Sequence, residues 1–166
     1  MSTSIQNVNQ IISNSSSEDV ENKFLTFFCD GQLFGVSIAH VVQIVGMQDI
    51  THIPESLDYM KGIINLRGSI ISVIDTRARL KKPEVKYDER TCIIISAIGD
   101  LTTGFIVDNV DEVINVDWDS IIAPPESSID STNRYITGIV TIHDKVILIM
   151  DIQKLFTPSE IERIRQ

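Results

Sequence analysis

The chain has little cysteine, few aromatic side chains and a shortage of basic residues. Its 166 residues include two cysteines, Cys29 and Cys92, and 6% aromatic residues, and 14 Lys and Arg stand against 23 Asp and Glu, for a net charge of −9. A disulfide-stapled secreted domain would carry more cysteines, bordered by loops rather than by apolar runs. Net negative charge repels nucleic-acid phosphates and anionic lipid surfaces. The composition therefore excludes a disulfide scaffold and disfavours nucleic-acid binding, and both cysteines are expected to be reduced core residues.

Long hydrophobic runs are also missing from the sequence. No segment approaches the ~18 uncharged apolar residues of a membrane span. The first 22 residues contain neither Lys nor Arg, nor the apolar stretch of a signal peptide. We therefore expect a cytoplasmic protein with no direct membrane insertion. With 43% hydrophobic residues, the chain can bury the core of one domain, or of two small ones, without metal or disulfides.

No residues stand at the spacing of an active site or a metal centre. His40, His52 and His143 lack metal-ligand spacing to one another and to the cysteines, and there is no glycine-rich phosphate loop. One acidic run alternates with apolar residues, as a solvated face does: Asp108, Asp111, Glu112, Asp117 and Asp119. No nucleophile, base and orienting group occur together. We predict neither an enzyme nor a protein that binds a metal or cofactor.

Short apolar runs rich in Ile, Val and Phe recur along most of the chain, which is typical of an all-β protein. They predict strands over 24–29, 33–38, 62–66, 69–75, 91–98, 103–107, 138–142 and 145–151. Hairpin turns are predicted at Asp30-Gly31 and His143-Asp144. Helices are minor: a C-terminal helix occupies 157–166, with its turns over 159–165 behind a Thr-Pro-Ser-Glu capping box, and short helices are predicted over 38–44 and 152–155.

The first 22 residues are mostly Ser, Asn, Gln and acidic residues, which favours a disordered N-terminal tail over 1–22. There is one alternative. Ile5, Val8 and Ile12 recur at a helical spacing, so this segment could form an amphipathic helix that docks on the body or on a partner.

The sequence repeats itself. A shift of 69 positions aligns Gly35 with Gly104, and a shift of 76 aligns Tyr59 with Tyr135, Gly62 with Gly138 and Asp75 with Asp151. The shift changes across 124–133, which is loop-like. We predict two homologous barrels, roughly 23–85 and 86–156, that interlock because a half of this length is marginal alone. A groove between such halves is an ordinary place for a partner to bind.

One Arg and one Asn interrupt the buried strands in the segment Gly-Ile-Ile-Asn-Leu-Arg-Gly that ends at Gly68. Arg67 has two interpretations. It could pair with a local carboxylate such as Asp75 at a hairpin tip, or it could offer a fork of donors to a partner, flanked by apolar contact surface.

These residues resemble the CheW family of bacterial chemotaxis coupling proteins. The resemblance rests on Phe34-Gly35-Val36-x-Ile38-x-x-Val41-x-x-Ile44, Thr51-x-Ile53-Pro54, Tyr59-x-x-Gly62-Ile63-Ile64-Asn65-Leu66-Arg67-Gly68, Val73-Ile74-Asp75 and Val107-Asp108-x-Val110. It covers a CheW-like domain over 23–156, with no receiver or kinase segment beside it. It implies two five-stranded SH3-like β-barrels and a non-enzymatic adaptor. Its implied partners are the cytoplasmic tip of chemoreceptors and the regulatory domain of the histidine kinase CheA, in membrane-associated arrays.

The resemblance also implies a receptor-binding set at Val41, Gln43, Gly62 and Arg67. On physical grounds we expect Ile63, Leu66 and Val41 to offer apolar contact to one face of a helical bundle. Two positions depart from the family. Gln43 stands where Glu is common, which puts the receptor class in question, and Thr76 stands where Leu is usual and is expected to be neutral. A CheW paralogue that serves a surface-sensing, pilus or second-messenger pathway is the alternative function.

Overall fold

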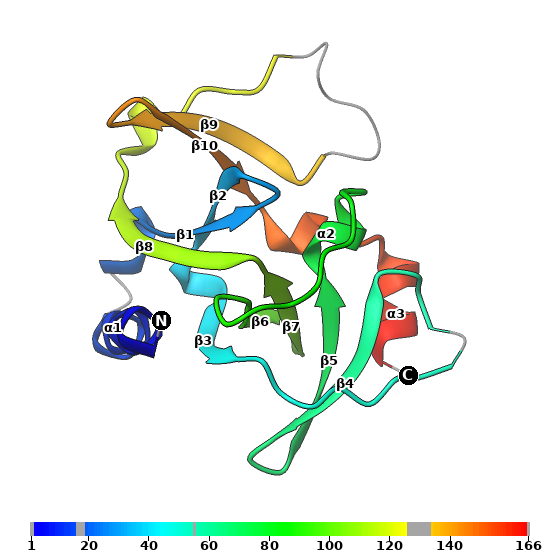
Figure 1. The fold of residues 1–166 in the computed structure, drawn as a ribbon. Helices are drawn as coiled ribbons and strands as arrows, with labels where there is room; N and C mark the ends of the chain where they lie inside the picture. The colour runs from blue at the N-terminus through cyan, green and yellow to red at the C-terminus, as the bar shows by residue number, and fades with distance from the viewer. Residues whose placement is uncertain (1, 16–18, 55, 126–133, 166) are drawn as a thin grey trace.

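The computed structural model describes residues 2–15, 19–54, 56–125 and 134–165, and strands dominate it (Figure 1). The strands are β1 (Lys23–Cys29), β2 (Gln32–Ser37), β3 (Val41–Gly46), β4 (Met60–Leu66), β5 (Ser69–Asp75), β6 (Cys92–Ile98), β7 (Leu101–Val107), β8 (Asn109–Asn115), β9 (Ile136–Ile142) and β10 (Lys145–Met150). The helices are α1 (Ser2–Asn14), α2 (Thr76–Arg79) and α3 (Pro158–Arg165). The predicted all-β class with a C-terminal helix is confirmed.

The strands form two five-stranded sheets, which we call barrel I, in the order β8-β1-β2-β10-β9, and barrel II, in the order β3-β6-β7-β5-β4. Each sheet curls until its end strands approach. In barrel II the N–H and C=O of Thr51, beyond β3, pair with Ile63 of β4 at 2.8 and 2.9 Å, respectively. In barrel I, Ile122 pairs with Ile139 of β9 in the same way. Both barrels are thus closed by a short bridge beyond an end strand.

Each barrel has its own apolar interior, centred on Phe24 and Ile147 in barrel I and on Ile64 and Ile93 in barrel II. A third and larger buried cluster lies where the barrels meet, and it includes Phe27, Val36, Val41, Ile44, Ile94 and Phe105. The continuous apolar runs that predict the strands are therefore explained by burial on both faces, because one face of these sheets fills a barrel and the other packs against the neighbouring barrel.

The internal repeat is visible in the pairing itself. Gly35 of β2 lies opposite Ile149 of parallel β10, and its counterpart Gly104 of β7 lies opposite Val73 of parallel β5. The N–H of Asp75 donates to the carbonyl of Tyr59, and the N–H of Asp151 donates to the carbonyl of Tyr135, both at 2.8 Å. These positions are the ones that the internal repeat aligns. The two halves therefore share the same strand register and the same hydrogen bonds there.

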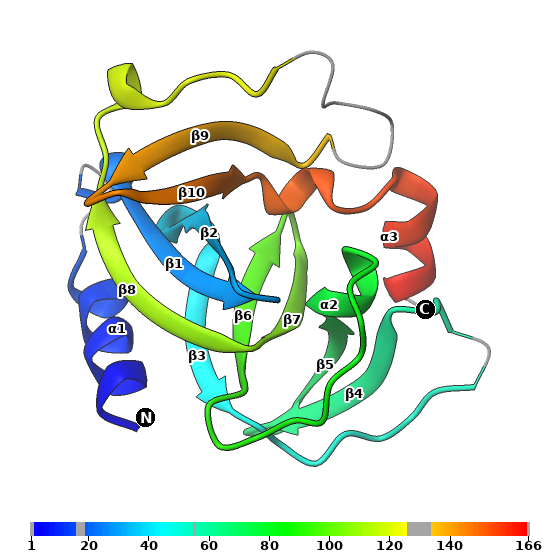
Figure 2. The same cartoon turned by 45° about the horizontal axis from the view of Figure 1, so that its top comes forward.

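The predicted barrel boundaries near residues 85 and 86 are wrong. Barrel I takes β1 and β2 from the first half and β8, β9 and β10 from the second, and barrel II takes the complementary strands. Each half thus gives its first hairpin to the other barrel (Figure 2). The exchange buries the apolar faces of both halves against each other, which a half of this size could not achieve alone.

Most local predictions are confirmed. Asp30-Gly31 and His143-Asp144 have positive φ at both residues, as two-residue hairpins require. The capping box before α3 forms, with Thr157 N–H donating to Glu160 at 2.9 Å and Glu160 N–H donating back to Thr157 at 3.2 Å.

The helix predicted over 38–44 is wrong: Ser37 does cap a turn over Ile38–His40, but the chain then continues as β3. The sequence pattern does not predict β8 as a strand, because its acidic residues alternating with apolar ones indicate only a solvated face.

The N-terminal tail is also corrected. Residues 2–14 form α1, which lies against β3 and β8 (Figures 1 and 2). Val8 is 3% exposed, and Ile5 and Ile12 pack against the cluster between the barrels. The alternative of an amphipathic helix docked on the body is therefore the arrangement observed. Residues 16–18 lie outside the described part of the chain.

Candidate protein-binding surface

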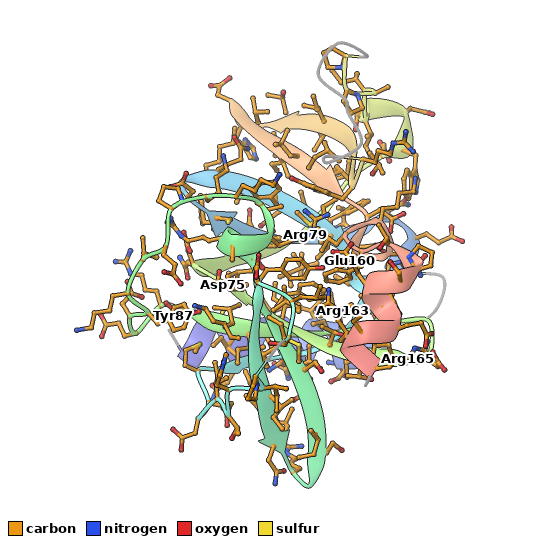
Figure 3. All side chains as sticks on the ribbon, turned by 90° about the vertical axis from the view of Figure 1, so that its right-hand side faces the viewer. Asp75, Arg79, Tyr87, Glu160, Arg163 and Arg165 are labelled. Carbon is orange, nitrogen blue, oxygen red and sulfur yellow. The ribbon has the colours of Figure 1, made fainter. Side chains whose placement is uncertain are left out.

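The β4–β5 hairpin projects beyond the rest of barrel II and carries Arg67 at its tip (Figures 1 and 3). Arg67 and Gly68 have φ of 54° and 90°, and the Asn65 side chain accepts the Gly68 N–H at 2.9 Å, which holds the turn. Arg67 is exposed, and no described residue forms a hydrogen bond or an ion pair with its guanidinium. Ile70, 63% exposed, lies on the same hairpin. The tip therefore presents five free N–H donors beside an exposed apolar side chain.

The alternative pairing of Arg67 with Asp75 does not occur. Asp75 is 3% exposed, caps α2 through the N–H of Ala78 at 3.3 Å and accepts the Tyr87 hydroxyl at 2.7 Å. Burial and this hydrogen bond to Asp75 raise the pKa of Tyr87 above its usual range. Asp75 is thus committed to the structure around α2 (Figure 3), and Arg67 has no local carboxylate partner among the described residues.

Gly62 is buried at the closure of barrel II. Its φ is +147°, and a Cβ at this position would lie 2.0 Å from the carbonyl oxygen of Thr51. That carbonyl accepts the N–H of Ile63, the hydrogen bond that joins the two ends of the sheet. Gly62 therefore supports the base of the hairpin and offers no side chain to a partner.

Val41 and Gln43 lie together on β3, yet they differ in exposure. Val41 is 5% exposed and belongs to the cluster between the barrels. The register against β6 shifts between these two residues, and Gln43 is half-buried. Val42 between them is 50% exposed. Of the four predicted receptor-binding residues, Arg67 is open to solvent and Gln43 is partly so, while Val41 and Gly62 are covered.

A groove of about 620 Å³ runs between the β4–β5 hairpin and α3, a feature that sequence reasoning missed. Ile63 and Ile70 line it from the hairpin, and Arg163 and Arg165 line it from the helix (Figure 3). The capping box predicted the helix, but nothing local indicates where a terminal helix docks. The groove places apolar and basic side chains next to the half-buried Ile63.

Arg79 is a second residue that the sequence did not single out. Its Nε donates to the carbonyl of Leu155 at 2.7 Å, and its guanidinium lies 5.8 and 5.5 Å from the ring centres of Tyr59 and Tyr135, the equivalent tyrosines of the two halves. The Tyr59 hydroxyl donates to Glu160. Burial alone would raise the pKa of Glu160, but hydrogen bonds from Thr157 and Tyr59 hold it below its usual value. This cluster ties α2 and α3 between the barrels (Figure 3).

Thr76 lies in a buried and mainly apolar environment. It is 3% exposed, and its hydroxyl has no hydrogen-bond partner among the described residues. It lies beside a small apolar cavity of about 20 Å³ lined by Phe27, Val36 and Ile94. A buried hydroxyl without a partner costs stability, whereas the expectation that Thr76 is neutral for the coupling role stays a prediction.

Reactive chemistry is lacking across the part of the chain that the structure describes. Cys29 and Cys92 are both buried free thiols, and burial raises the pKa of each to about 12, so neither is a nucleophile at neutral pH. Among the described residues, no three His, Cys, Asp or Glu side chains gather as a metal site would require. Nor is any described helix long and apolar enough to cross a bilayer.

We expect stability to fall as the pH rises above the ordinary thiol value of 9.0, because the two buried thiols keep their protons in the fold and lose them on unfolding. Their contribution is complete below pH 9.0 and is lost as the pH rises toward about 12. Each thiol adds a slope of up to about 1.4 kcal/mol per pH unit. Urea unfolding in the presence of reductant, at roughly pH 8 and pH 10, measures this change in the free energy of unfolding. Cys92→Ala should lower the slope; an equal slope contradicts the assignment.

Comparison with known proteins decides the family. A model of the CheW-like domain matches residues 23–160. The chain belongs to the CheW family. The chemotaxis protein CheW of Klebsiella aerogenes is 32% identical over 90% of each chain, and that of Bacillus subtilis is 36% identical over 78% of this chain and 83% of its own. The crystal structure of the scaffolding protein TtCheW from Thermoanaerobacter tengcongensis superposes with a TM-score of 0.76 at 37% identity, covering 84% of this chain and 94% of that one.

Membership of the CheW family confirms the resemblance seen in the motifs around Gly62 and Arg67. It makes the chain a chemotaxis coupling and scaffold protein, a non-catalytic adaptor with partners in chemotaxis signalling. The two five-stranded sheets agree with the two-barrel architecture of the family.

Proposed function

We propose that this CheW-family protein works in the cytoplasm and joins the cytoplasmic tip of methyl-accepting chemoreceptors to the regulatory domain of the histidine kinase CheA, within membrane-associated arrays. The observation that carries the receptor side is Arg67 at the tip of the β4–β5 hairpin, which has no partner among the described residues and lies on the same hairpin as exposed Ile70. Arginine beside apolar surface is typical of the residues that dominate protein interfaces. A rigid hairpin that holds such a pair offers orientation and contact together.

The four receptor-binding residues then divide into two roles. Arg67 and Gln43 are the ones with side-chain atoms available to a receptor, so we assign them direct contact. Gly62 and Val41 are buried, and we assign them the support of the hairpin and of β3. Gln43 is uncharged where Glu is common in the family, so the receptor surface that faces it need not supply a cation.

The kinase side follows from similarity of shape. The resemblance to the CheW family implies that the CheA regulatory domain is itself CheW-like. Contact between the two would then bring one pair of barrels against another, and we place it largely on the barrel that carries the first hairpin. Coupling also requires that the adaptor bind the active and inactive arrangements of the kinase with different free energies. A scaffold that bound both equally would join the proteins without relaying a signal.

Arg67→Ala is expected to weaken binding of a chemoreceptor cytoplasmic fragment by about 30-fold, close to 2 kcal/mol, which is the usual effect of losing an arginine hot spot. Binding of the CheA regulatory domain should not change. Because Arg67 has no partner among the described residues, the melting temperature should stay within roughly 1 °C. Calorimetric titration against each partner and thermal unfolding measure these effects.

The matched control is Arg90→Ala, which removes an exposed arginine on the loop before β6. It should leave both affinities unchanged. A large fall in melting temperature for Arg67→Ala would show that the residue is structural. If the wild-type chain binds neither partner, the paralogous surface-sensing, pilus or second-messenger pathway takes the place of chemoreceptor coupling.

A further inference from the structure

α1 covers a surface that spans the two barrels. It lies against β3 of barrel II and β8 of barrel I (Figures 1 and 2). Val8 is buried in the same cluster as Val41 and Ile44 of β3, and Ile5 and Ile12 pack against that cluster from one turn on either side. The helix therefore rests on the strand that carries Val41 and Gln43.

Asn9 makes a two-point contact with the edge of barrel II. Its Oδ1 accepts the N–H of Ile44 at 2.8 Å, and its Nδ2 donates to the carbonyl of Ile44 at 2.9 Å. β3 is an end strand of its sheet. A side-chain amide thus takes the place that a neighbouring strand would take on an open backbone edge. With α1 docked, the Asn9 side chain takes the place of water at the N–H and C=O of Ile44.

α1 depends on this surface for its own helical structure. Its 13 residues include no charged side chain and consist mostly of Ser, Thr, Asn, Ile and Val, which are weak helix formers. Isolated helices of this length are marginal in water even with favourable sequences. Openings of about 460 and 520 Å³ adjoin the helix, one near Ile5 and Met47 and the other near Ile11 and Lys23. α1 is thus flanked by open surface hollows and belongs to neither sheet, so the strand pairing of both barrels does not include it.

We propose that the β3–β8 surface is a helix-binding groove which α1 occupies in the free chain, and that an amphipathic receptor helix replaces α1 when the adaptor engages its receptor. This inference rests on the proposed function, which places receptor contact on β3. The bound helix must reproduce what α1 supplies: apolar residues at the spacing of Ile5, Val8 and Ile12, and an Asn or Gln at the position of Asn9.

Occupation by α1 sets the affinity of the groove for an external helix. Only molecules whose α1 has left can bind, so the apparent dissociation constant is the intrinsic one divided by the vacant fraction. Weakening the docking of α1 therefore strengthens receptor binding.

Asn9→Ala in the full chain tests the groove. Losing both hydrogen bonds to Ile44 should raise the vacant fraction, so that a receptor cytoplasmic fragment binds about tenfold more tightly. The matched control is Asn7→Ala, which makes the same substitution, with the same gain in helix propensity, at an exposed position of α1. It should not increase the affinity. Hydrogen exchange of 2–14, measured with and without the fragment, should show α1 losing protection on binding while β6 keeps it.

The outcomes separate the two proposals. If the fragment binds, Asn9→Ala matches Asn7→Ala and α1 keeps its protection in the complex, the groove is overturned and receptor coupling stands. If neither wild type nor variants bind the fragment, receptor coupling fails and the groove proposal fails with it. If α1 of the free chain exchanges as slowly as β6, so that it leaves only on global unfolding, the groove is overturned whatever the fragment does.

Discussion

Replacing Gly62 with alanine is expected to destabilise the protein by about 4 kcal/mol, or roughly 10 °C in melting temperature. A Cβ at this position would lie 2.0 Å from the Thr51 carbonyl oxygen, which is backbone and cannot rotate away. The φ of +147° is itself unfavourable for a residue with a Cβ. Relief requires breaking the Thr51–Ile63 bridge that closes barrel II. Chemical unfolding monitored by circular dichroism measures the loss.

Gly138 provides the control, because it occupies the equivalent position in the other half. Its added Cβ would meet the Ile121 side chain at 2.3 Å and the Ile122 carbonyl oxygen only at 3.5 Å, and its φ lies outside the left-handed region. A side chain can shift where a carbonyl cannot, so Gly138→Ala should cost about 1 to 2 kcal/mol. Equal losses at the two glycines would refute the argument from backbone contact. A small loss of stability for Gly62→Ala would instead favour the interpretation that Gly62 contacts the partner directly.

This asymmetry sets a limit on what the repeat could predict. The aligned pairs Tyr59 and Tyr135, and Asp75 and Asp151, make equivalent hydrogen bonds in the structure, which confirms the repeat at these positions. The alignment could not anticipate the exchange of the first hairpins between barrels. Apolar alternation specifies which face of a strand is buried but not which strand lies beside it. The choice of neighbour is settled by burial across both halves.

Two local errors have the same origin. Ser37 caps a single helical turn, but the apolar spacing over 38–44 fits one helix face as well as a strand with a register shift, and β3 has such a shift. α1 was favoured as a tail because its composition is that of disordered segments. Its order comes from docking against β3 and β8 and from the Asn9 contact with Ile44, which no local pattern encodes.

The candidate surface was predictable in part. The strands predicted over 62–66 and 69–75 place Arg67 and Gly68 at a turn, which is confirmed, and Asn65 and Gly68 are residues that favour such a turn. The burial of Val41 and Gly62 could not be foreseen. Val41 faces the cluster between the barrels and Gly62 faces a loop that closes barrel II, and both contacts join segments distant in sequence.

The second large effect is expected at Arg77 of α2, where Arg77→Met should destabilise the protein by about 2 to 3 kcal/mol. Arg77 donates to both carboxylate oxygens of Asp108 at 2.8 and 2.7 Å, to the Pro83 carbonyl at 2.9 Å and to Asp30 at 3.3 Å. Asp108, which the sequence predicted to belong to a solvated face, also accepts the Asp30 N–H at 2.9 Å. One guanidinium therefore links α2 to the first hairpin of barrel I. Urea unfolding measures its contribution.

Lys61→Met is the matched control. Lys61 pairs with Glu84, whose side chain is 73% exposed, so solvent and mobility leave that pair with little net effect. Removing Arg77, whose side chain is 13% exposed, instead leaves the Asp30 and Asp108 carboxylates close together without their shared cation. Adding Asp108→Asn to Arg77→Met should therefore restore part of the loss, because it removes one of the two repelling charges. If Arg77→Met costs no more than Lys61→Met, strand pairing and apolar packing hold the exchanged hairpin without a contribution from this ion pair.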